Sequence, residues 1–308
     1  MRALALILGF TLSLNWAPSQ EVIRVTWPTT RASPPAAIPG TSPDVLSAIR
    51  FGLLVMSESN ALEMAVNQSS MLGISANEAS HLRQLFAERY GIIQKDPVFR
   101  DVASALPYCF SAQTPAEGLA LVYCPKRIGT NTPALIFLHG YGGSFLWSQQ
   151  LLAEAFPNWL IVCPAFGIGS ALMPSAYLSE CLQAVEKNLR QPIKAPVLIG
   201  LSAGGFGACR IYTQSPKQFS RLIVLAAYPP NETLGHFNKQ MHVRFLVGAK
   251  EDYVQSGFFG RYMQSIHPRP SDLEFQIVPD ADHFFMLSKK EQTLKILRGW
   301  LETPGSKK

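Results

Sequence analysis

The alternation of short apolar runs with amphipathic stretches over residues 106–302 most constrains how this 308-residue chain can fold. The runs that we expect to form strands are 119–124, 134–138, 159–163, 197–199, 222–226, 243–247 and 273–278. The stretches with helical periodicity between several of them are 145–156, 175–189, 203–214 and 253–266. Strands that are apolar throughout are typical of a mostly parallel sheet with helices on both faces. We therefore expect a three-layer α/β domain of about eight strands.

The segment before residue 106 divides into three parts of different composition. Residues 1–19 contain Arg2 and then a largely apolar run, a pattern typical of a secretory signal peptide. Residues 20–43 are rich in Pro, Thr, Ser and Ala, which predicts a linker. Residues 44–105 carry apolar residues at spacings of three and four, which predicts a helical prefix that packs on the α/β domain.

The apolar run near the N-terminus is shorter than the roughly 20 residues that a membrane span needs. We therefore expect a secreted or periplasmic protein with no stable membrane span. Residues 303–308, which are polar and carry two lysines, are expected to be a tail.

Composition and motifs exclude several classes of function. The Lys and Arg residues behind the net charge of +6 are spread along the chain. A nucleic-acid-binding protein usually concentrates them in one patch or stripe, so we expect no nucleic-acid partner. The five cysteines show no C-x-x-C spacing, which argues against a structural metal. Export would permit a disulfide, and Cys109 and Cys124 form the favoured pair. No cofactor-binding motif is found, so no cofactor is expected.

The sequence Gly200-Leu201-Ser202-Ala203-Gly204 directly follows an apolar run and precedes a helical stretch. A G-x-S-x-G motif between a strand and a helix is typical of a nucleophile elbow, in which the serine occupies a sharp turn. Glycines are needed at Gly200 and Gly204 because side chains there would collide with neighbouring backbone. We expect Ser202 to be a nucleophile, the alternative being a purely structural glycine-rich turn.

The loop His139-Gly140-Tyr141-Gly142-Gly143 follows the expected strand 134–138. Acyl transfer places negative charge on a carbonyl oxygen, so two N–H groups should point at that oxygen. We assign the backbone N–H groups of Tyr141 and Ala203 to this oxyanion hole. Gly140 and His139 are expected to support the loop, His139 as a packed residue.

A serine hydroxyl needs a base, and a neutral base needs an acid that orients it. His283 follows the last expected strand and is the candidate base, the alternative being an ordinary surface histidine. Asp252 follows the preceding strand and is the leading candidate for the acid. Glu251 is the alternative acid, because this loop has one residue more than the common G-x-x-D spacing. Either carboxylate could instead be an exposed charge.

The chain order Ser202, Asp252, His283 is that of the α/β-hydrolases, and the sequence resembles this superfamily from about residue 106 to 301. The run G-L-S-A-G-G at Gly200–Gly205 resembles the esterases that include polyhydroxyalkanoate depolymerases and feruloyl esterases. The resemblance implies a serine esterase that forms an acyl-enzyme. The alternatives are a peptidase or acyltransferase with the same residues, or a catalytically silent binding module of this fold.

The interval between the expected strands 222–226 and 243–247 has only sixteen residues. An interval of this length is too short for the large lid that many α/β-hydrolases carry there. We therefore expect an open site that accepts a small-molecule or polymeric ester.

Overall fold

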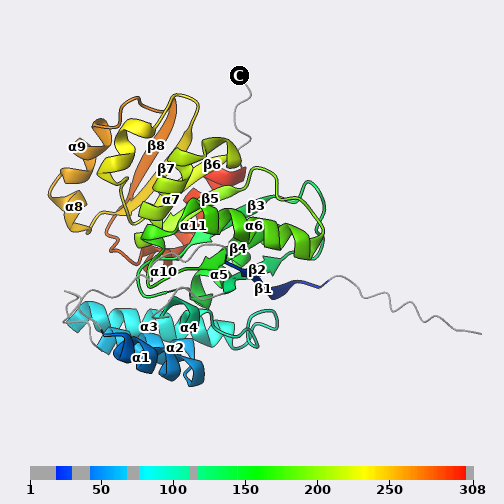
Figure 1. Ribbon diagram of the computed structural model, residues 1–308. Coiled ribbons are helices and arrows are strands. Elements are labelled where there is room, and N and C mark those ends of the chain that lie inside the picture. The colour runs from blue at the N-terminus through cyan, green and yellow to red at the C-terminus, as the bar shows by residue number, and fades with distance from the viewer. Residues whose placement is uncertain (1–18, 30–41, 68–75, 111–116, 144, 303–308) are drawn as a thin grey trace, which may run out of the picture.

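The computed structural model describes residues 19–29, 42–67, 76–110, 117–143 and 145–302 (Figure 1). The predicted signal peptide, except its last residue, and the predicted tail lie outside the described residues. So do residues 30–41 of the predicted linker. No helix in the described part of the chain is long and apolar enough to cross a membrane.

Within the described residues, eight strands form one sheet in the order β1-β2-β4-β3-β5-β6-β7-β8. The pairs β1–β2 and β2–β4 are antiparallel, and all the other pairs are parallel. The mostly parallel sheet predicted from the apolar runs is therefore confirmed. The strands are β1 Glu21–Pro28, β2 Glu117–Cys124, β3 Ala134–Leu138, β4 Leu160–Ala165, β5 Val197–Leu201, β6 Arg221–Leu225, β7 His242–Gly248 and β8 Asp272–Val278.

Strand β1 corrects the prediction that residues 20–43 are a linker. Residues 21–28 pair with β2 along its whole length, from Glu21 opposite Cys124 to Pro28 opposite Glu117. Trp27 is buried, and its ring lies over Gly118, where a Cβ atom would come within 2.2 Å of it. Pro28 is tolerated because it ends an edge strand. The strand was missed because its partner residues lie 89 to 103 positions further along the chain, and local sequence carries no sign of that pairing.

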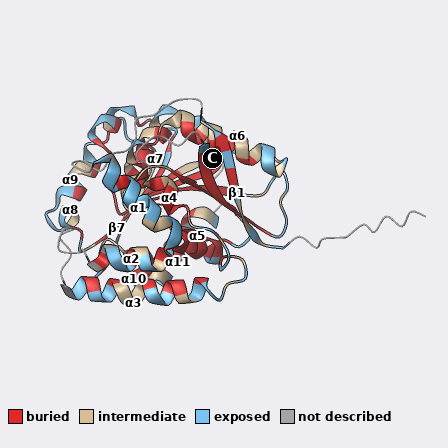
Figure 2. Ribbon diagram, turned by 60° about the horizontal axis from the view of Figure 1, so that its bottom comes forward, coloured by how far each residue is buried: buried red, intermediate tan, exposed pale blue. Residues whose placement is uncertain are grey.

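Helices cover both faces of the sheet and bury two separate apolar cores (Figure 1). Alternate residues of one strand belong to different cores: Phe137 faces one and Ile136 the other. The first core includes α5 Leu146–Ala155 and α11 Lys290–Glu302. The second core includes α6 Ser175–Leu189, α7 Ala203–Gln214 and α9 Phe258–Gln264. The strands in the middle of the sheet are buried (Figure 2), whereas the edge strands β1 and β8 are partly exposed.

The N-terminal helices pack on the α5 side of the sheet. They are α1 Pro43–Val55, α2 Glu58–Asn67 and α3 Ala76–Ile93, followed by the single turn α4 Leu106–Cys109. Leu62 of α2 and Leu82 and Phe86 of α3 belong to the same buried core as α5. In the described residues, the predicted prefix is thus helical and packs on the α/β domain.

One helical stretch near the C-terminus is broken where a single helix was expected. The expected helix 253–266 consists of α8 Asp252–Gln255 and α9, which are separated by Gly257 at φ +69°. The last helical segment consists of α10 Phe285–Ser288 and α11. A left-handed glycine ends a helix readily, which explains the break at Gly257.

The expected disulfide between Cys109 and Cys124 is wrong. All five cysteines are free and buried. Cys109 lies on the helical turn α4, whereas Cys124 ends strand β2. The two cysteines therefore do not lie opposite each other on paired strands.

Candidate active site

Ser202 occupies the sharp turn between β5 and α7. Its backbone has φ +53° and ψ −119°, a conformation that is strained for a residue with a side chain. A Cβ atom on Gly200 would lie 2.2 Å from the Gly204 carbonyl oxygen, and one on Gly204 would lie 2.1 Å from that of Leu138. Both positions therefore require glycine, for the steric reason expected from the motif. The turn leaves the Ser202 side chain at the N-terminus of α7.

His283 follows β8 and joins two side chains that are far from it in sequence. Its Nε2 atom lies 3.0 Å from Ser202 Oγ, and its Nδ1 atom lies 3.0 Å from each carboxylate oxygen of Glu251. An ionised carboxylate only accepts hydrogen bonds, so Nδ1 carries the proton and donates it. Nε2 is then the free acceptor for the Ser202 hydroxyl. In this arrangement the His283 imidazole can take the hydroxyl proton of Ser202.

Glu251, and not Asp252, is the carboxylate that the structure places against His283. The Glu251 side chain is only 8% exposed and is the N-cap residue of α8, whereas Asp252 is exposed at the first position of that helix. Two backbone hydrogen bonds join the turn before Glu251 to the segment that leads to His283. Ala249 N–H donates to Val278 O, and Lys250 N–H donates to Ala281 O. With the turn held in this way, residue 251 faces the imidazole and residue 252 begins the helix on the outside. The preference for Asp252 is therefore corrected in favour of the alternative acid.

The two residues assigned to the oxyanion hole lie on either side of one glycine. A Cβ atom on Gly169 would lie 2.9 Å from the Ala203 Cβ and 3.4 Å from the Tyr141 Cα. A Cβ atom on Gly140 would lie 3.3 Å from the Ser202 Cβ, so this loop also packs closely against the serine. The structure thus brings Tyr141 and Ala203 together beside Ser202.

Gly169 was not identified from the sequence, although it is essential to this close approach. The only signal was the pair of glycines in F-G-I-G-S directly after β4. The neighbouring residue Ile168 also holds the loop, because its carbonyl accepts a 2.7 Å hydrogen bond from Gly142 N–H.

His139 is buried beneath the same loop. Its Nε2 accepts a 3.2 Å hydrogen bond from Phe166 N–H, so its Nδ1 carries the proton and donates to Gly140 O at 2.9 Å. Burial lowers the pKa of His139 to about 4, and the side chain is neutral at ordinary pH. His139 therefore joins the start of the loop to the end of β4.

An aromatic cluster joins helix α7 to the segment that follows Glu251. Tyr228, which follows β6, is at its centre, and its ring centroid lies 5.2–5.6 Å from those of four other rings. Those four residues are Phe206, Tyr253, Phe258 and Tyr262. The connection between β6 and β7 that carries Tyr228 contains only the short 3₁₀ helix Asn231–His236. No lid helix is inserted there.

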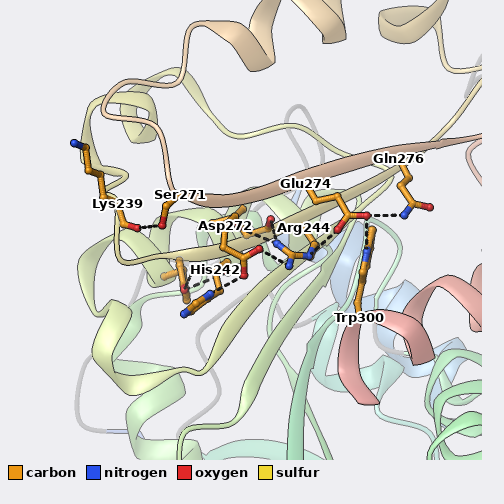
Figure 3. A network of polar contacts seen from close by, with 10 residues as sticks. Lys239, His242, Arg244, Ser271, Asp272, Glu274, Gln276 and Trp300 are labelled. Carbon is orange, nitrogen blue, oxygen red and sulfur yellow. Dashed lines mark hydrogen bonds and ion pairs between the residues drawn. The ribbon is translucent and has the colours of Figure 1, made fainter. Parts of the chain in front are cut away.

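A second polar network lies at the opposite end of strands β7 and β8 (Figure 3). Arg244 forms ion pairs with Asp272 at 2.5 Å and with Glu274 at 3.3 Å, and His242 also contacts Asp272. His242 and Asp272 begin their strands, whereas Glu251 and His283 follow the ends of the same strands. This network therefore holds the edge strand β8 to its neighbour and takes no part in the Ser202 site.

The strand order and the positions of the three side chains define the class of this structure. Ser202 follows β5, Glu251 follows β7 and His283 follows β8, all at the carboxyl edge of one sheet. This arrangement is the α/β-hydrolase fold. The described residues contain no group of three or more His, Cys, Asp or Glu side chains that could hold a metal ion.

Solved structures with a similar backbone include several named hydrolases and esterases. One is a predicted CIB-like hydrolase from Thermoplasma acidophilum, with 18% identity and TM-score 0.48 over 61% of this chain and 93% of that chain. Another is the α/β hydrolase MGS-M2 from a Medee basin deep-sea metagenome library, with 10% identity and TM-score 0.49 over 62% of this chain and 97% of that chain. A ferulic acid esterase has 17% identity and TM-score 0.45 over 60% of this chain and 92% of that chain. No protein-family model and no curated protein matches the chain.

Proposed function

We propose that this protein is a serine hydrolase that cleaves carboxylic esters through an acyl-enzyme. The observation that carries the proposal is the unbroken line of contacts from Ser202 Oγ to His283 Nε2, and from His283 Nδ1 to Glu251. Three residues from separate parts of the chain meet in the geometry that activates a hydroxyl group.

Each residue then has a defined role in the reaction. His283 takes the hydroxyl proton as Ser202 attacks the ester carbonyl, and Glu251 stabilises the imidazolium that forms. The backbone N–H groups of Tyr141 and Ala203 stabilise the negative charge on the carbonyl oxygen. His283 then protonates the leaving alcohol and activates the water that releases the acid.

The accessibility of the site supports a substrate that approaches from solvent. Tyr141 is 61% exposed, the His283 side chain is 39% exposed, and the connection between β6 and β7 carries no lid helix. Such a site suits a small-molecule ester or an ester group on a polymer. The resemblance of Gly200–Gly205 to the esterase motif supports an ester as the substrate, and the test below includes amides as the alternative.

The test uses the purified full-length protein and its Ser202→Ala variant. A fluorophosphonate probe should label the wild type and not the variant. A panel of p-nitrophenyl esters of increasing acyl length and a matched panel of peptide amides then identify the bond that is cleaved. Faster cleavage of amides would identify a peptidase. Acyl transfer to an added alcohol in preference to water would identify an acyltransferase. A wild type that is neither labelled nor active would contradict the proposal.

A further inference from the structure

Glu58, near the start of α2, is a buried carboxylate far from the site in sequence. It is only 5% exposed, and burial raises its pKa above the ordinary value. A charged side chain is rarely buried unless other groups bind it. Three groups donate hydrogen bonds to Glu58: Ser104 Oγ–H at 2.7 Å, Tyr90 O–H at 2.8 Å and the Leu146 backbone N–H at 2.7 Å.

The bond to Leu146 makes Glu58 the cap of helix α5. Leu146 is the first residue of α5, and the residue at the usual capping position, Phe145, makes no side-chain cap. The first N–H groups of a helix carry partial positive charge and need acceptors. Glu58 of α2 supplies one of those acceptors, although it lies 88 positions before Leu146 in the sequence.

Helix α5 begins directly after the loop that carries Tyr141, so its N-terminus anchors the far end of that loop. Glu58 is also connected to this loop indirectly, through its hydrogen bond with Ser104. The Ser104 hydroxyl accepts a 3.0 Å hydrogen bond from Leu106 N–H, and Leu106 packs on Gly143, where a Cβ atom would lie 2.7 Å from its side chain. His139 holds the near end of the loop to the end of β4. The Tyr141 amide therefore lies between two anchored ends.

The helix that contains Tyr90 also contacts the loop of the base. The ring of Phe86 on α3 lies 6.2 Å from that of Phe284, and Phe284 lies 5.5 Å from the His283 ring. The N-terminal helices therefore contact both the segment that begins at the loop of Tyr141 and the loop that carries His283.

From these contacts we infer that Glu58 is a positioning residue, which holds the Tyr141 amide in the oxyanion hole through the N-terminus of α5. This inference rests on the proposed function. Loss of Glu58 leaves the contacts of Ser202, His283 and Glu251 in place but releases one end of the oxyanion loop. The oxyanion forms only in the transition state, so the expected defect is in kcat and not in KM.

The experiment compares three variants of the full-length chain. Glu58→Ala removes all three hydrogen bonds, whereas Glu58→Gln can keep them, because its oxygen accepts from Leu146 and Tyr90 and its amide donates to Ser104 Oγ. Leu82→Ala is the matched control, since Leu82 is buried in the prefix core but makes none of these hydrogen bonds. Rates are divided by the number of active sites titrated with fluorophosphonate, which corrects for misfolded protein.

We expect Glu58→Ala to lower kcat about 10- to 100-fold with KM changed less than about threefold. Glu58→Gln should restore most of kcat, and Leu82→Ala should retain it even where it lowers Tm by as much as Glu58→Ala. An unchanged kcat in Glu58→Ala would overturn the inference. An equal loss of kcat in Leu82→Ala at the same loss of Tm would also overturn it, because the role would then be general prefix stability.

Hydrogen–deuterium exchange of peptides covering residues 138–147 gives a readout that does not depend on activity. Faster exchange in Glu58→Ala but not in Glu58→Gln supports the positioning role, and equal exchange contradicts it. If the wild type is inactive and unlabelled, the proposed function fails, and the exchange data still decide whether Glu58 holds this loop.

Discussion

The Glu251 carboxylate contacts His283 Nδ1 with both of its oxygens at 3.0 Å, while the next residue, Asp252, lies exposed at the start of α8. Adjacent acids in one turn therefore have different environments. Only one of them can orient the imidazole, and the backbone bonds at Ala249 and Lys250 determine which.

Replacing Glu251 with glutamine should lower kcat/KM by about 10⁴, because an amide can donate to Nδ1 and so favour the wrong tautomer. Replacing Asp252 with asparagine is the matched control and should change kcat/KM by less than about threefold. Both are measured with a p-nitrophenyl ester that the wild type cleaves. A large loss in Asp252→Asn together with normal activity in Glu251→Gln would show that the acid is Asp252.

Replacing Gly204 with alanine should destabilise the fold by roughly 2 kcal/mol or more and abolish labelling of Ser202, because the new methyl group meets the Leu138 carbonyl. Gly91, within α3, is the control: a Cβ atom there meets nothing within 4 Å. Gly91→Ala should therefore stabilise the protein by about 0.5–1 kcal/mol. Urea unfolding measures both free energies. A Gly204→Ala protein with wild-type stability and labelling would contradict the account of the turn.

The buried Glu58 should make stability fall as pH rises. Its pKa is raised by burial in the folded state, so the folded protein binds the proton more tightly than the unfolded chain does. Stability is therefore lost between the ordinary pKa of 4.5 and the raised one. Unfolding free energies of the wild type and Glu58→Gln across this range should diverge, with the wild type losing stability relative to the variant. A constant difference across the range would contradict the raised pKa.

His139 should have the opposite effect, because its pKa is lowered from 6.5 to about 4. The unfolded chain binds the proton more readily between these values, so stability is lost as pH falls through this window, by up to about 1.4 kcal/mol per pH unit. An NMR titration of the His139 ring should show a neutral imidazole down to about pH 4. His139→Gln removes the group, and its stability should depend less on pH over the same window. Titration of the ring near pH 6.5 would contradict this environment.

Ser202 and its glycines could be predicted from the sequence because the reason for them is local. The strain at Ser202 and the close approach of Gly200 to Gly204 arise within a few consecutive residues. Gly204 also meets the Leu138 carbonyl of β3, but the G-x-S-x-G spacing marks that position as glycine as well. The strands β3 to β8 were predictable for a similar reason, since a buried parallel strand must be apolar along its whole length.

Other features depend on contacts between distant segments and leave no local signal. Glu251 and Asp252 are chemically alike, and only the packing of β7 beside the loop after β8 separates their roles. In a helical stretch Glu58 resembles any surface glutamate, and its burial comes from Tyr90, Ser104 and Leu146, which are 32, 46 and 88 residues away.

The sequence alone identified the candidate nucleophile, the candidate base and the layered α/β fold, because periodicity and turn sterics act over a few residues. The tertiary structure decided which acid faces His283, where β1 pairs, and that Glu58 caps α5. The physical reason is that a carboxylate is defined by its neighbours: the same side chain is an exposed charge in water and a specific hydrogen-bond acceptor when folding buries it among donors.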